Sequence, residues 1–286
     1  MTSPLLSIVI VVYNAKGTIG QAIQSVLEQT YNNIELLIID GGSTDGTLEV
    51  IKEFAPRIAY TVSEKDKGIY DAMNKGIAAS RGEWIFFLGA DDRLYTDTTI
   101  ETLFHPANLE AADFLYGDVE FTSNKRRYGG SKTYRQLIEQ NICHQAIFYR
   151  RALFGVHGNY NIRYPILADY EMNLRLFRQP AIRTKYVPAI VTLFNDKGAS
   201  NVTIDRYFHG DMLGYYLAND HISFFSPLLQ QYHFYYGYVS LFNKQVLKGS
   251  RHILMSWLSG KRKLFFFLLT GKFLLMNLGN KKIKIR

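Results

Sequence analysis

The sequence contains one cysteine, Cys143, among 286 residues, so no disulfide bond can form within the chain. This lack suits a reducing compartment, and we expect a cytoplasmic protein. Basic residues are absent before Lys16, so the chain also lacks the charged start of a signal peptide. The apolar run that precedes Lys16 is short and rich in β-branched residues, which is typical of a buried strand.

Acidic residues are absent after Asp220. Residues 1–220 contain 22 Lys/Arg and 25 Asp/Glu, a net charge of −3, whereas residues 221–286 contain 11 Lys/Arg and have a net charge of +11. This asymmetry predicts that a basic segment meets an anionic surface, either a nucleic acid or a membrane. The sequence shows no recognisable nucleic-acid-binding module, so we expect no nucleic acid partner.

The basic segment also lacks an apolar run of about 20 residues, the length that a membrane-spanning helix needs. Its most apolar part, residues 264–279, is interrupted by Lys272 and flanked by basic residues. Aromatic residues with basic flanks are typical of a helix that lies in a membrane interface and is attracted by anionic lipid. A buried pair of C-terminal helices is the alternative. We predict that residues 221–286 form a helical extension, peripheral on the inner face of the plasma membrane.

The first hundred residues alternate between strand and helix patterns. Because the predicted strands are solidly apolar, they favour a parallel sheet covered by helices on both faces. The predicted strands are Leu6–Val12, Ile34–Ile39, Ile58–Val62 and Trp84–Leu88, and the predicted helices are Thr18–Gln29, Thr47–Phe54 and Tyr70–Ala79. Weaker patterns later in the chain predict strands over Phe114–Phe121 and Ala146–Tyr149 and a helix over Tyr164–Phe177.

The dinucleotide-binding fingerprint GxGxxG is absent after the first predicted strand, so a bound nucleotide would be held in another way. Polar side chains nevertheless follow every predicted strand of the first half. Sheets of this type bind their ligands beyond the carboxyl ends of the strands, so these side chains are expected to share a site. They are Tyr13 and Asn14, then Asp40, then Glu64 and Asp66, and finally Asp91 and Asp92.

Three stretches of the chain, SIVIVVYN, ELLIIDGGSTDGT and SEKDKGIYDAMNKGIAASRGEWIFFLGADD, resemble the nucleotide-binding half of family 2 glycosyltransferases. The resemblance continues more weakly through CHQAIFYRR and ADYEMNLRL and so covers roughly residues 5–178. The form KGIYDAMNKG is similar to the bacterial surface-polysaccharide and exopolysaccharide members. Two departures are Val11, where the family often has proline, and Gly89, where its metal motif Asp-x-Asp-Asp has the first acid.

The resemblance implies the GT-A fold, a Rossmann-like, mostly parallel α/β sheet with helices on both faces. It implies a glycosyltransferase domain over residues 1–220, with a nucleotide-binding half in residues 1–100 and an acceptor half in residues 101–220. Enzymes of this family transfer a sugar, with inversion, from a nucleotide diphosphate donor. By resemblance alone, UDP is the expected nucleotide.

Asp91 and Asp92 are the predicted metal ligands. A divalent cation, Mg²⁺ or Mn²⁺, neutralises a leaving diphosphate when the protein supplies hard oxygen ligands and leaves coordination positions open. Mg²⁺ takes one or two carboxylates in such sites, which is the number that this pair offers. A turn or a helix cap is the alternative role for an Asp-Asp pair that follows a strand.

The resemblance also implies the nucleotide contacts. Asp40 would accept a hydrogen bond from the imide N–H of the base while Tyr13 lies against the ring, and Asp66 would contact the nucleotide. Capping of the turn GGSTDGT is the alternative for Asp40, and a solvated loop charge is the alternative for Asp66. Asp71 and Asn74 would line the donor pocket, whereas surface charge pairing is the alternative for this helix face.

Asp169 matches the family's general base, which accepts the proton of the acceptor hydroxyl. Glu171 is the second choice, and charge pairing with Arg175 or Arg178 is the alternative role on this helix. His144 and Gln145 are expected to contact the acceptor or the diphosphate, although a structural role for His144 fits equally well. A nucleophilic role for Cys143 is rejected because inverting transfer needs no covalent intermediate.

The sequence therefore predicts a metal-dependent inverting glycosyltransferase that builds a surface polysaccharide or a lipid-linked oligosaccharide. Its partners would be a nucleotide-sugar donor, a saccharide or lipid-linked acceptor and a membrane surface. Two alternatives remain. The chain could be a non-catalytic nucleotide-sugar-binding subunit of a synthase complex, or a sugar nucleotidyltransferase. The second lacks support because no Gly-rich loop with Arg or Lys follows the first strand.

Overall fold

The computed structural model describes residues 3–110, 112–195 and 246–259, together with 205, 207–208, 211, 230, 233–234 and 237. The chain divides into two compact units. The first consists of Met1–Leu137 and Asn141–Asn201, and the second consists of Ile138–Gln140 and Val202–Arg286. The predicted domain boundary at residue 220 and the predicted interfacial segment 264–279 lie outside the described residues.

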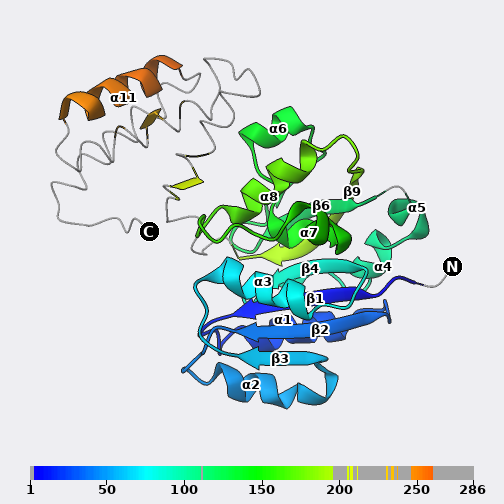
Figure 1. The fold of residues 1–286 in the computed structure, drawn as a ribbon. Helices are drawn as coiled ribbons and strands as arrows, with labels where there is room; N and C mark the ends of the chain where they lie inside the picture. Colours follow the sequence, from blue (N-terminus) through cyan, green and yellow to red (C-terminus); the bar gives the residue numbers. More distant parts are fainter. Residues whose placement is uncertain are drawn as a thin grey trace. The chain divides into compact units, whose positions relative to one another are not determined.

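The first four strands form the parallel part of a sheet (Figure 1). β1 (Leu6–Val12) lies between β2 (Ile34–Asp40) and β4 (Trp84–Gly89), and β3 (Tyr60–Ser63) pairs with the outer side of β2. Every residue of β1 is buried, as expected for a parallel strand with helices on both faces. β3 lies at the edge, is mostly exposed, and begins two residues later than the predicted strand Ile58–Val62.

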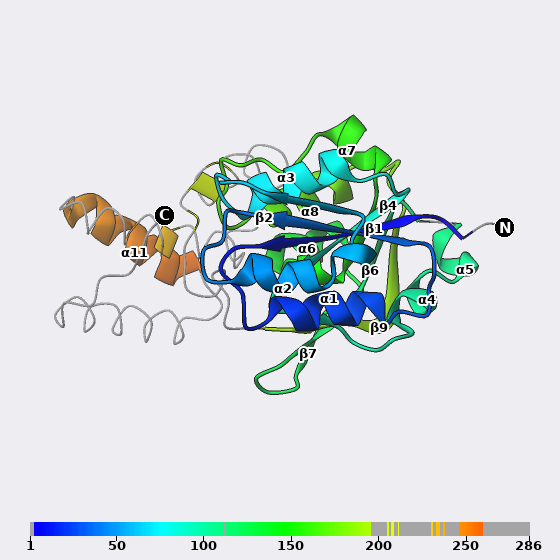
Figure 2. The same cartoon turned by 90° about the horizontal axis from the view of Figure 1, so that it is seen from below.

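Helices cover both faces of this parallel part. Figure 2 shows α1 (Ile19–Leu27) and α2 (Thr47–Glu53) on one face and α3 (Ile69–Ala79) on the other. α3 approaches β1 closely because Gly76 has no side chain, and a Cβ at this position would overlap a methyl group of Val9. The three helices match the predicted ones, with ends that differ by one or two residues.

Beyond β4 the sheet is mixed. β8 (Ile147–Arg150) runs antiparallel to both β4 and β6 (Phe114–Phe121), and β9 (Thr184–Phe194) runs parallel to β6. The carboxyl ends of β4, β6 and β9 therefore point toward the same edge as those of β1 and β2. Two short strands complete the sheet, β5 (Arg93–Leu94) against β9 and β7 (Arg127–Tyr128) against β6.

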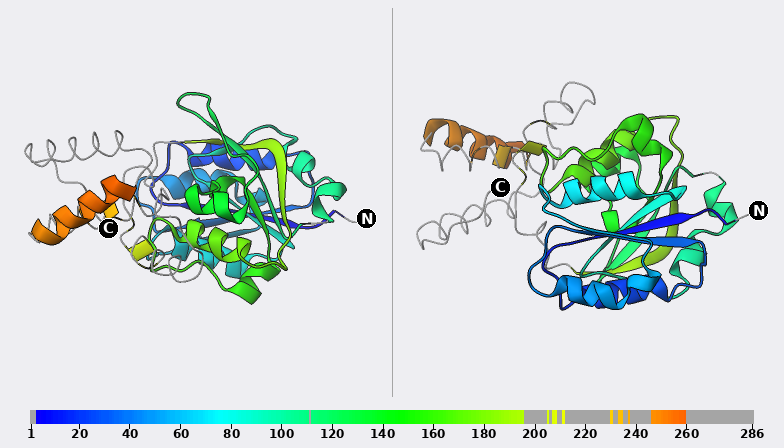
Figure 3. Two further views of the ribbon diagram at one scale, coloured as in Figure 1. Left: turned by 90° about the horizontal axis from the view of Figure 1, so that it is seen from above. Right: turned by 60° about the horizontal axis from the view of Figure 1, so that its bottom comes forward.

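The described residues thus form a nine-stranded sheet in the order β3-β2-β1-β4-β8-β6-β9-β5, with β7 beside β6. The predicted α/β class with helices on both faces is confirmed, and Figure 3 shows the strands between the helical layers from two further directions. The remaining short elements of the first unit are η1 (Ala55–Arg57), α4 (Thr99–Leu103), α5 (Pro106–Leu109), η2 (His144–Ala146), α7 (Ala152–His157) and α8 (Ala168–Phe177). The helix α6 (Tyr134–Glu139) has its first four residues in this unit.

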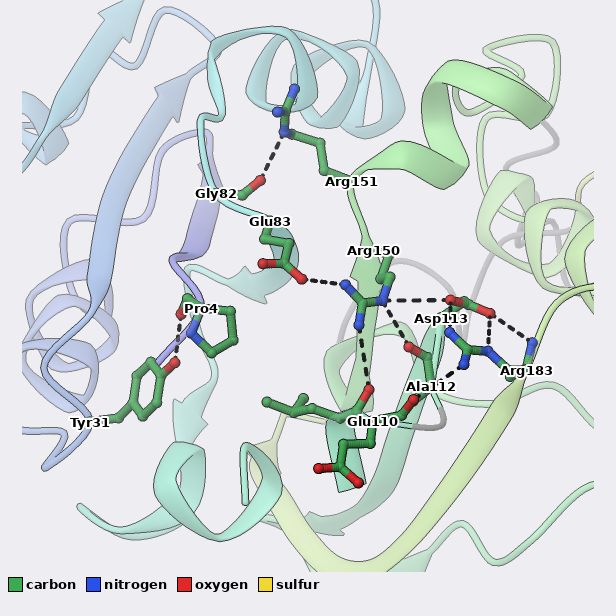
Figure 4. A network of polar contacts seen from close by, with 11 residues as sticks. Pro4, Tyr31, Gly82, Glu83, Glu110, Ala112, Asp113, Arg150, Arg151 and Arg183 are labelled. Atoms are coloured by element: carbon green, nitrogen blue, oxygen red, sulfur yellow. Dashed lines mark hydrogen bonds and ion pairs between the residues drawn. The ribbon is translucent and has the colours of Figure 1, made fainter. Parts of the chain in front are cut away.

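An arginine-rich network lies at the edge of the sheet opposite the predicted site (Figure 4). It joins the start of β4, the start of β6 and the end of β8, because Arg150 pairs with both Glu83 and Asp113. Arg183, directly before β9, donates to both carboxylate oxygens of Asp113 at 2.8 and 2.9 Å. These bonds lower the pKa of Asp113. The network fixes the parallel and mixed parts of the sheet to each other.

Of the second unit, the structure describes Ile138–Gln140, the helix α11 (Val246–Ser259) and a few separate residues. This helix lies within the predicted helical extension, residues 221–286. Within the described ranges, every helix is too short or too polar to cross a bilayer.

Candidate active site

The polar residues that follow the first strands meet at one edge of the sheet. Val12 pairs with Asp40 and Val11 pairs with Gly89, so the ends of β2 and β4 lie on either side of the end of β1. Neighbouring strands are about 4.8 Å apart, which places the ends of β2 and β4 about 10 Å apart. Tyr13 follows β1 directly and is 65% exposed, although it is a large aromatic residue.

Asp40 is fully buried and holds the turn that follows β2. Its Oδ2 accepts hydrogen bonds from the backbone N–H groups of Gly42 and Ser43 and from the Ser63 hydroxyl, at 3.1, 3.0 and 2.6 Å. Its Oδ1 accepts a fourth from the Ser43 hydroxyl at 2.5 Å. The structure therefore shows the turn-capping role. Direct contact between Asp40 and a nucleobase stays a prediction.

Gly41 lies between Tyr13 and Asp66. A Cβ at Gly41 would overlap Asp66 Oδ2 and would lie 3.5 Å from Cδ2 of the Tyr13 ring. Asp66 Oδ1 accepts a hydrogen bond from the Gly68 N–H at 2.9 Å, whereas Oδ2 accepts none from a described residue. The missing side chain of Gly41 thus brings an aromatic ring and a carboxylate oxygen with spare hydrogen-bonding capacity close together.

Asp71 and Asn74 on α3 both make contacts within the protein. Asp71 Oδ2 lies 3.9 Å from Lys75 Nζ, which lies 2.8 Å from Glu64 Oε1. The Asn74 amide donates to the carbonyl of Tyr160 and accepts from its N–H, at 2.9 and 3.0 Å. Asp71 therefore has the charge pairing given above as its alternative, and Asn74 holds the Tyr160 backbone against α3. Donor contacts of either residue stay predictions.

Asp91 and Asp92 have different surroundings although they are adjacent. Asp92 is 1% exposed, and its oxygens accept hydrogen bonds from the Asn195 N–H at 2.7 Å and from Gln145 Nε2 at 3.0 Å. Burial raises the pKa of Asp92 to about 7. Asp91 is exposed, and its Oδ2 accepts from Asn195 Nδ2 at 2.8 Å. Its Oδ1 accepts no hydrogen bond from a described residue.

The open carboxylate of Asp91 fits a cation that takes most of its ligands from elsewhere. In the described part of the chain, no cluster of three or more His, Cys, Asp or Glu residues could enclose a metal ion by itself. Mg²⁺ commonly takes one or two protein carboxylates and completes its shell with water and substrate phosphate. Asp91 at the sheet edge meets this requirement, whereas the buried Asp92 has both oxygens in use.

Gln145 supports Asp92. While its Nε2 donates to Asp92, its Oε1 accepts from the Cys143 thiol at 2.9 Å. Burial raises the pKa of the Cys143 thiol, so the group stays protonated and is a poor nucleophile. This agrees with the rejection of a cysteine nucleophile. The predicted acceptor or diphosphate contact of Gln145 stays a prediction, and the structure gives it a supporting role.

Asp169 lies in the first turn of α8 and is 6% exposed. Its Oδ1 accepts a hydrogen bond from the Tyr70 hydroxyl at 2.6 Å, and its Oδ2 accepts one from Asn141 Nδ2 at 2.9 Å. Glu171 pairs with Arg175, whose Nε lies 3.0 Å from Glu171 Oε1. The charge pairing expected on this helix therefore belongs to Glu171, and Asp169 has no salt bridge to an arginine or lysine among the described residues.

His144 lies near the carboxylates of both Asp169 and Asp91. Its Nδ1 lies 3.9 Å from Asp169 Oδ2. Burial lowers the pKa of His144, and the carboxylates of Asp169 and Asp91 act against this effect. Both carboxylates are therefore close enough to influence one imidazole. One polar cluster therefore forms from three parts of the chain. It contains Asp91 and Asp92 after β4, His144 and Gln145 of η2, and Asp169 at the start of α8.

Sequence analysis did not select Asn195, Tyr70 or Asn141. Asn195 lies directly after β9 and bonds to both Asp91 and Asp92. A strand-end rule extended to the last strand would have found it, because β9 is parallel to β6. Tyr70 and Asn141 contact Asp169 across sequence separations of 99 and 28 residues, and no local pattern indicates either contact.

Comparison with known proteins identifies the family to which this chain is related. Glycosyl transferase family 2 matches residues 7–179. The PGL/p-HBAD biosynthesis glycosyltransferase of Mycobacterium tuberculosis is 42% identical over 214 residues, which cover 73% of this chain and 84% of that protein. The family match covers nearly all of the parallel half of the sheet and also the segment that contains Asp169.

Two solved structures share the fold at low sequence identity. Staphylococcus aureus TarS 1-349 in complex with UDP has a TM-score of 0.59 at 16% identity, covering 84% of this chain and 73% of that chain. The mannosyltransferase PcManGT from Pyrobaculum calidifontis, in complex with GDP-Man and Mn²⁺, has a TM-score of 0.57 at 16% identity, covering 96% and 81%. The chain spans 40% of a longer TarS chain. The family match over most of the first unit and the 42% identity to the mycobacterial relative show that the chain belongs to glycosyl transferase family 2.

Proposed function

We propose that this glycosyltransferase moves a sugar, with inversion, from a UDP-sugar to a saccharide or lipid-linked saccharide acceptor in cell-surface polysaccharide or glycolipid biosynthesis. The observation that supports this most is the common polar cluster of Asp91 and Asp169, in which Gln145 donates to Asp92 at 3.0 Å and the neighbouring His144 lies 3.9 Å from Asp169 Oδ2. One carboxylate is open and suits a cation on the leaving group. The other is buried, ordered and free of any arginine or lysine partner among the described residues.

The donor's nucleoside would bind at Tyr13 and Asp66. The exposed ring of Tyr13 offers a stacking face, and Asp66 Oδ2 offers an acceptor beside it across Gly41. Asp40 would keep the turn in place, because its four hydrogen bonds fix the backbone on which Gly41 lies. The structures of UDP-bound TarS and GDP-Man-bound PcManGT are consistent with a nucleotide donor on this fold.

A divalent cation, when bound, neutralises the charge that develops on the departing diphosphate. Asp91 would hold this cation, with Asn195 orienting its carboxylate. Asp92 would act indirectly by fixing the Asn195 backbone through a 2.7 Å hydrogen bond. Both aspartates were predicted to serve the metal, and we now propose Asp91 alone as its ligand.

Asp169 would act as the general base. Its carboxylate accepts the proton of the acceptor hydroxyl while the acceptor oxygen bonds to the anomeric carbon. The bond from this carbon to the diphosphate oxygen breaks on the opposite side, and the nucleoside diphosphate leaves. Attack opposite the leaving group inverts the configuration.

A turnover assay tests the function. The purified chain is incubated with UDP-, GDP- and TDP-sugars, a saccharide or lipid-linked acceptor and Mn²⁺ or Mg²⁺, and nucleoside diphosphate release is measured. We expect acceptor-dependent release with one donor class, and the same donor should raise the melting temperature because it binds the native state. Stabilisation without turnover would favour the non-catalytic subunit. Pyrophosphate release from a nucleoside triphosphate would favour the nucleotidyltransferase.

The membrane contact is proposed for the extension that contains α11. Three exposed leucines, Leu247, Leu254 and Leu258, follow one another at intervals of seven and four residues, so they lie on one side of the helix. Arg251 is exposed on the same side, and residues 221–286 contain no acidic residue. An exposed apolar helix face with cations and without acids suits an anionic bilayer. A lipid-linked acceptor would be held at the same surface.

Vesicle flotation tests this contact with the full chain. We expect binding to phosphatidylcholine vesicles that contain phosphatidylglycerol, and weaker binding to phosphatidylcholine alone. The double variant L254S/L258S should bind at least about 10-fold more weakly, because burial of a leucine side chain is worth about 1.5–3 kcal/mol. Val156→Ser, which changes an exposed apolar residue of α7, is the matched control. Equal binding of both variants to anionic vesicles would contradict the proposal.

A further inference from the structure

The two oxygens of Asp169 are held from opposite sides by different parts of the fold. Tyr70, on α3, donates to Oδ1 at 2.6 Å, and Asn141, between α6 and η2, donates to Oδ2 at 2.9 Å. A carboxyl group with two fixed donors has one orientation. Neither donor has a role in the mechanism as described above, so their effect must come through Asp169.

The Asn141 amide is itself held by a second asparagine. Asn141 Oδ1 accepts a hydrogen bond from Asn173 Nδ2 at 2.9 Å, and Asn173 Oδ1 accepts one from the Tyr149 hydroxyl at 2.9 Å. Asn173 is fully buried and lies four residues after Asp169 on α8, so both side chains extend from the same side of this helix. The series runs from β8 through α8 to the loop before η2 and ends at the carboxylate.

The direction of the donors depends on the charge of Asp169. With Tyr149 as the first donor, each amide accepts through its oxygen and donates through its nitrogen, and the last acceptor is Asp169 Oδ2. Reversing both amides would turn the oxygen of Asn141 toward Asp169, and only a protonated carboxyl could then complete the series. Tyr70 behaves similarly, since its single proton has a second acceptor, the carbonyl of Ile166 at 2.7 Å.

We propose that Asn141, oriented by Asn173 and Tyr149, is a positioning residue that keeps the Asp169 carboxylate aimed at the acceptor hydroxyl. This inference rests on the proposed general-base role of Asp169. Hydrogen bonds to an ionised group are stronger than those to a neutral one, so a carboxylate that accepts from both Asn141 and Tyr70 is held firmly in this orientation. When the acceptor's proton arrives, Tyr70 can donate to the Ile166 carbonyl instead.

The variant Asn141→Ala tests the proposal in the full chain. Loss of one hydrogen bond to a charged group predicts a kcat about 10- to 100-fold lower, with the dissociation constant of the nucleotide-sugar unchanged. The acid limb of the kcat profile should move to higher pH, because the ionised carboxylate has lost a donor. Asn108→Ala is the matched control, since the side-chain amide of Asn108 donates, among the described residues, to the carbonyls of Thr102 and Leu103 and not to the site.

Tyr149→Phe provides a milder second variant. It keeps the ring that packs against Phe114 and Phe154 and removes only the hydroxyl at the far end of the series. We expect the acid limb to move in the same direction by a smaller amount. The titratable groups that lie close enough to respond to the charge of Asp169 are Tyr70, Cys143, His144, Tyr149 and Tyr160. Among these, His144 is the group that titrates on the acid side, so the comparison is repeated with His144→Gln.

The outcomes separate this inference from the proposed function. If Asp169→Asn is inactive while Asn141→Ala and Tyr149→Phe keep the parental kcat and pH profile, the positioning role is wrong and the general-base role stands. If Asp169→Asn is fully active, both fail. A fall in kcat for Asn141→Ala that is accompanied by an equal loss of donor affinity and by no change in the pH profile would indicate a merely structural role, and would also overturn the inference.

Discussion

Replacing Asp91 with asparagine is expected to lower kcat at least about 100-fold and to remove its dependence on Mn²⁺ or Mg²⁺, since a bound cation supplies several kcal/mol of charge stabilisation. The substitution is nearly isosteric, and the exposed position of Asp91 makes a folding defect unexpected. The measurement is kcat as a function of cation concentration. Asp97→Asn is the matched control, because Asp97 is another exposed acid and lies between β5 and α4, close to Asp91 in sequence.

Asp92 should respond differently to the same change. Its two oxygens face two donors, the Asn195 N–H and the Gln145 amide, so an asparagine NH₂ group would oppose one of them. We expect Asp92→Asn to lose stability, by about 1–3 kcal/mol for a buried donor left without an acceptor, and to keep its cation dependence. If Asp91→Asn retained cation-dependent activity while Asp92→Asn lost it, the assignment of the two residues would be reversed.

Asp169→Asn is expected to lower kcat by about 10²- to 10⁴-fold, the usual contribution of a general base. Donor binding should remain, because the nucleoside site at Tyr13 and Asp66 lies on other elements. Isothermal titration with the nucleotide-sugar measures the binding, and initial rates at saturating donor measure kcat. The loss should not be rescued by added cation.

Glu171→Gln is the control for this prediction. Glu171 lies on the same helix and burial raises its pKa, but it is paired with Arg175. We expect its kcat to stay within a few-fold of the parent and its stability to fall slightly. A Glu171→Gln variant without activity beside an active Asp169→Asn variant would transfer the base role to Glu171.

The fold was largely predictable because buried parallel strands leave a strong signal. Continuous apolar runs such as Leu6–Val12 have no other environment that suits them, and the structure places the strand at these residues. The second half was harder to predict. β8 and β9 pair with strands that are distant in sequence, β8 antiparallel to β4 and β9 parallel to β6, and such pairings leave no local sequence pattern.

The acidic residues of the site were predictable, but neither their individual roles nor their partners Asn195, Tyr70 and Asn141 were. The strand-end rule selected Asp40, Asp91 and Asp92, but local sequence cannot show that Asp92 is buried beneath Asn195, which lies 103 residues later. The turn-capping role of Asp40 depends on neighbours two and three residues away, so it was within reach of sequence reasoning. The contact between Asn74 and the Tyr160 backbone spans 86 residues of sequence, so sequence reasoning could not predict it.

Crystals grown with Mn²⁺ and UDP would test the central claim most directly, by anomalous diffraction from the manganese. We predict one anomalous peak bonded to the Asp91 carboxylate and to the diphosphate, a uracil ring against Tyr13, and the Asp169 carboxylate facing the open side of the diphosphate. Manganese bound away from Asp91, or a nucleotide whose diphosphate does not share a cavity with Asp169, would contradict the account.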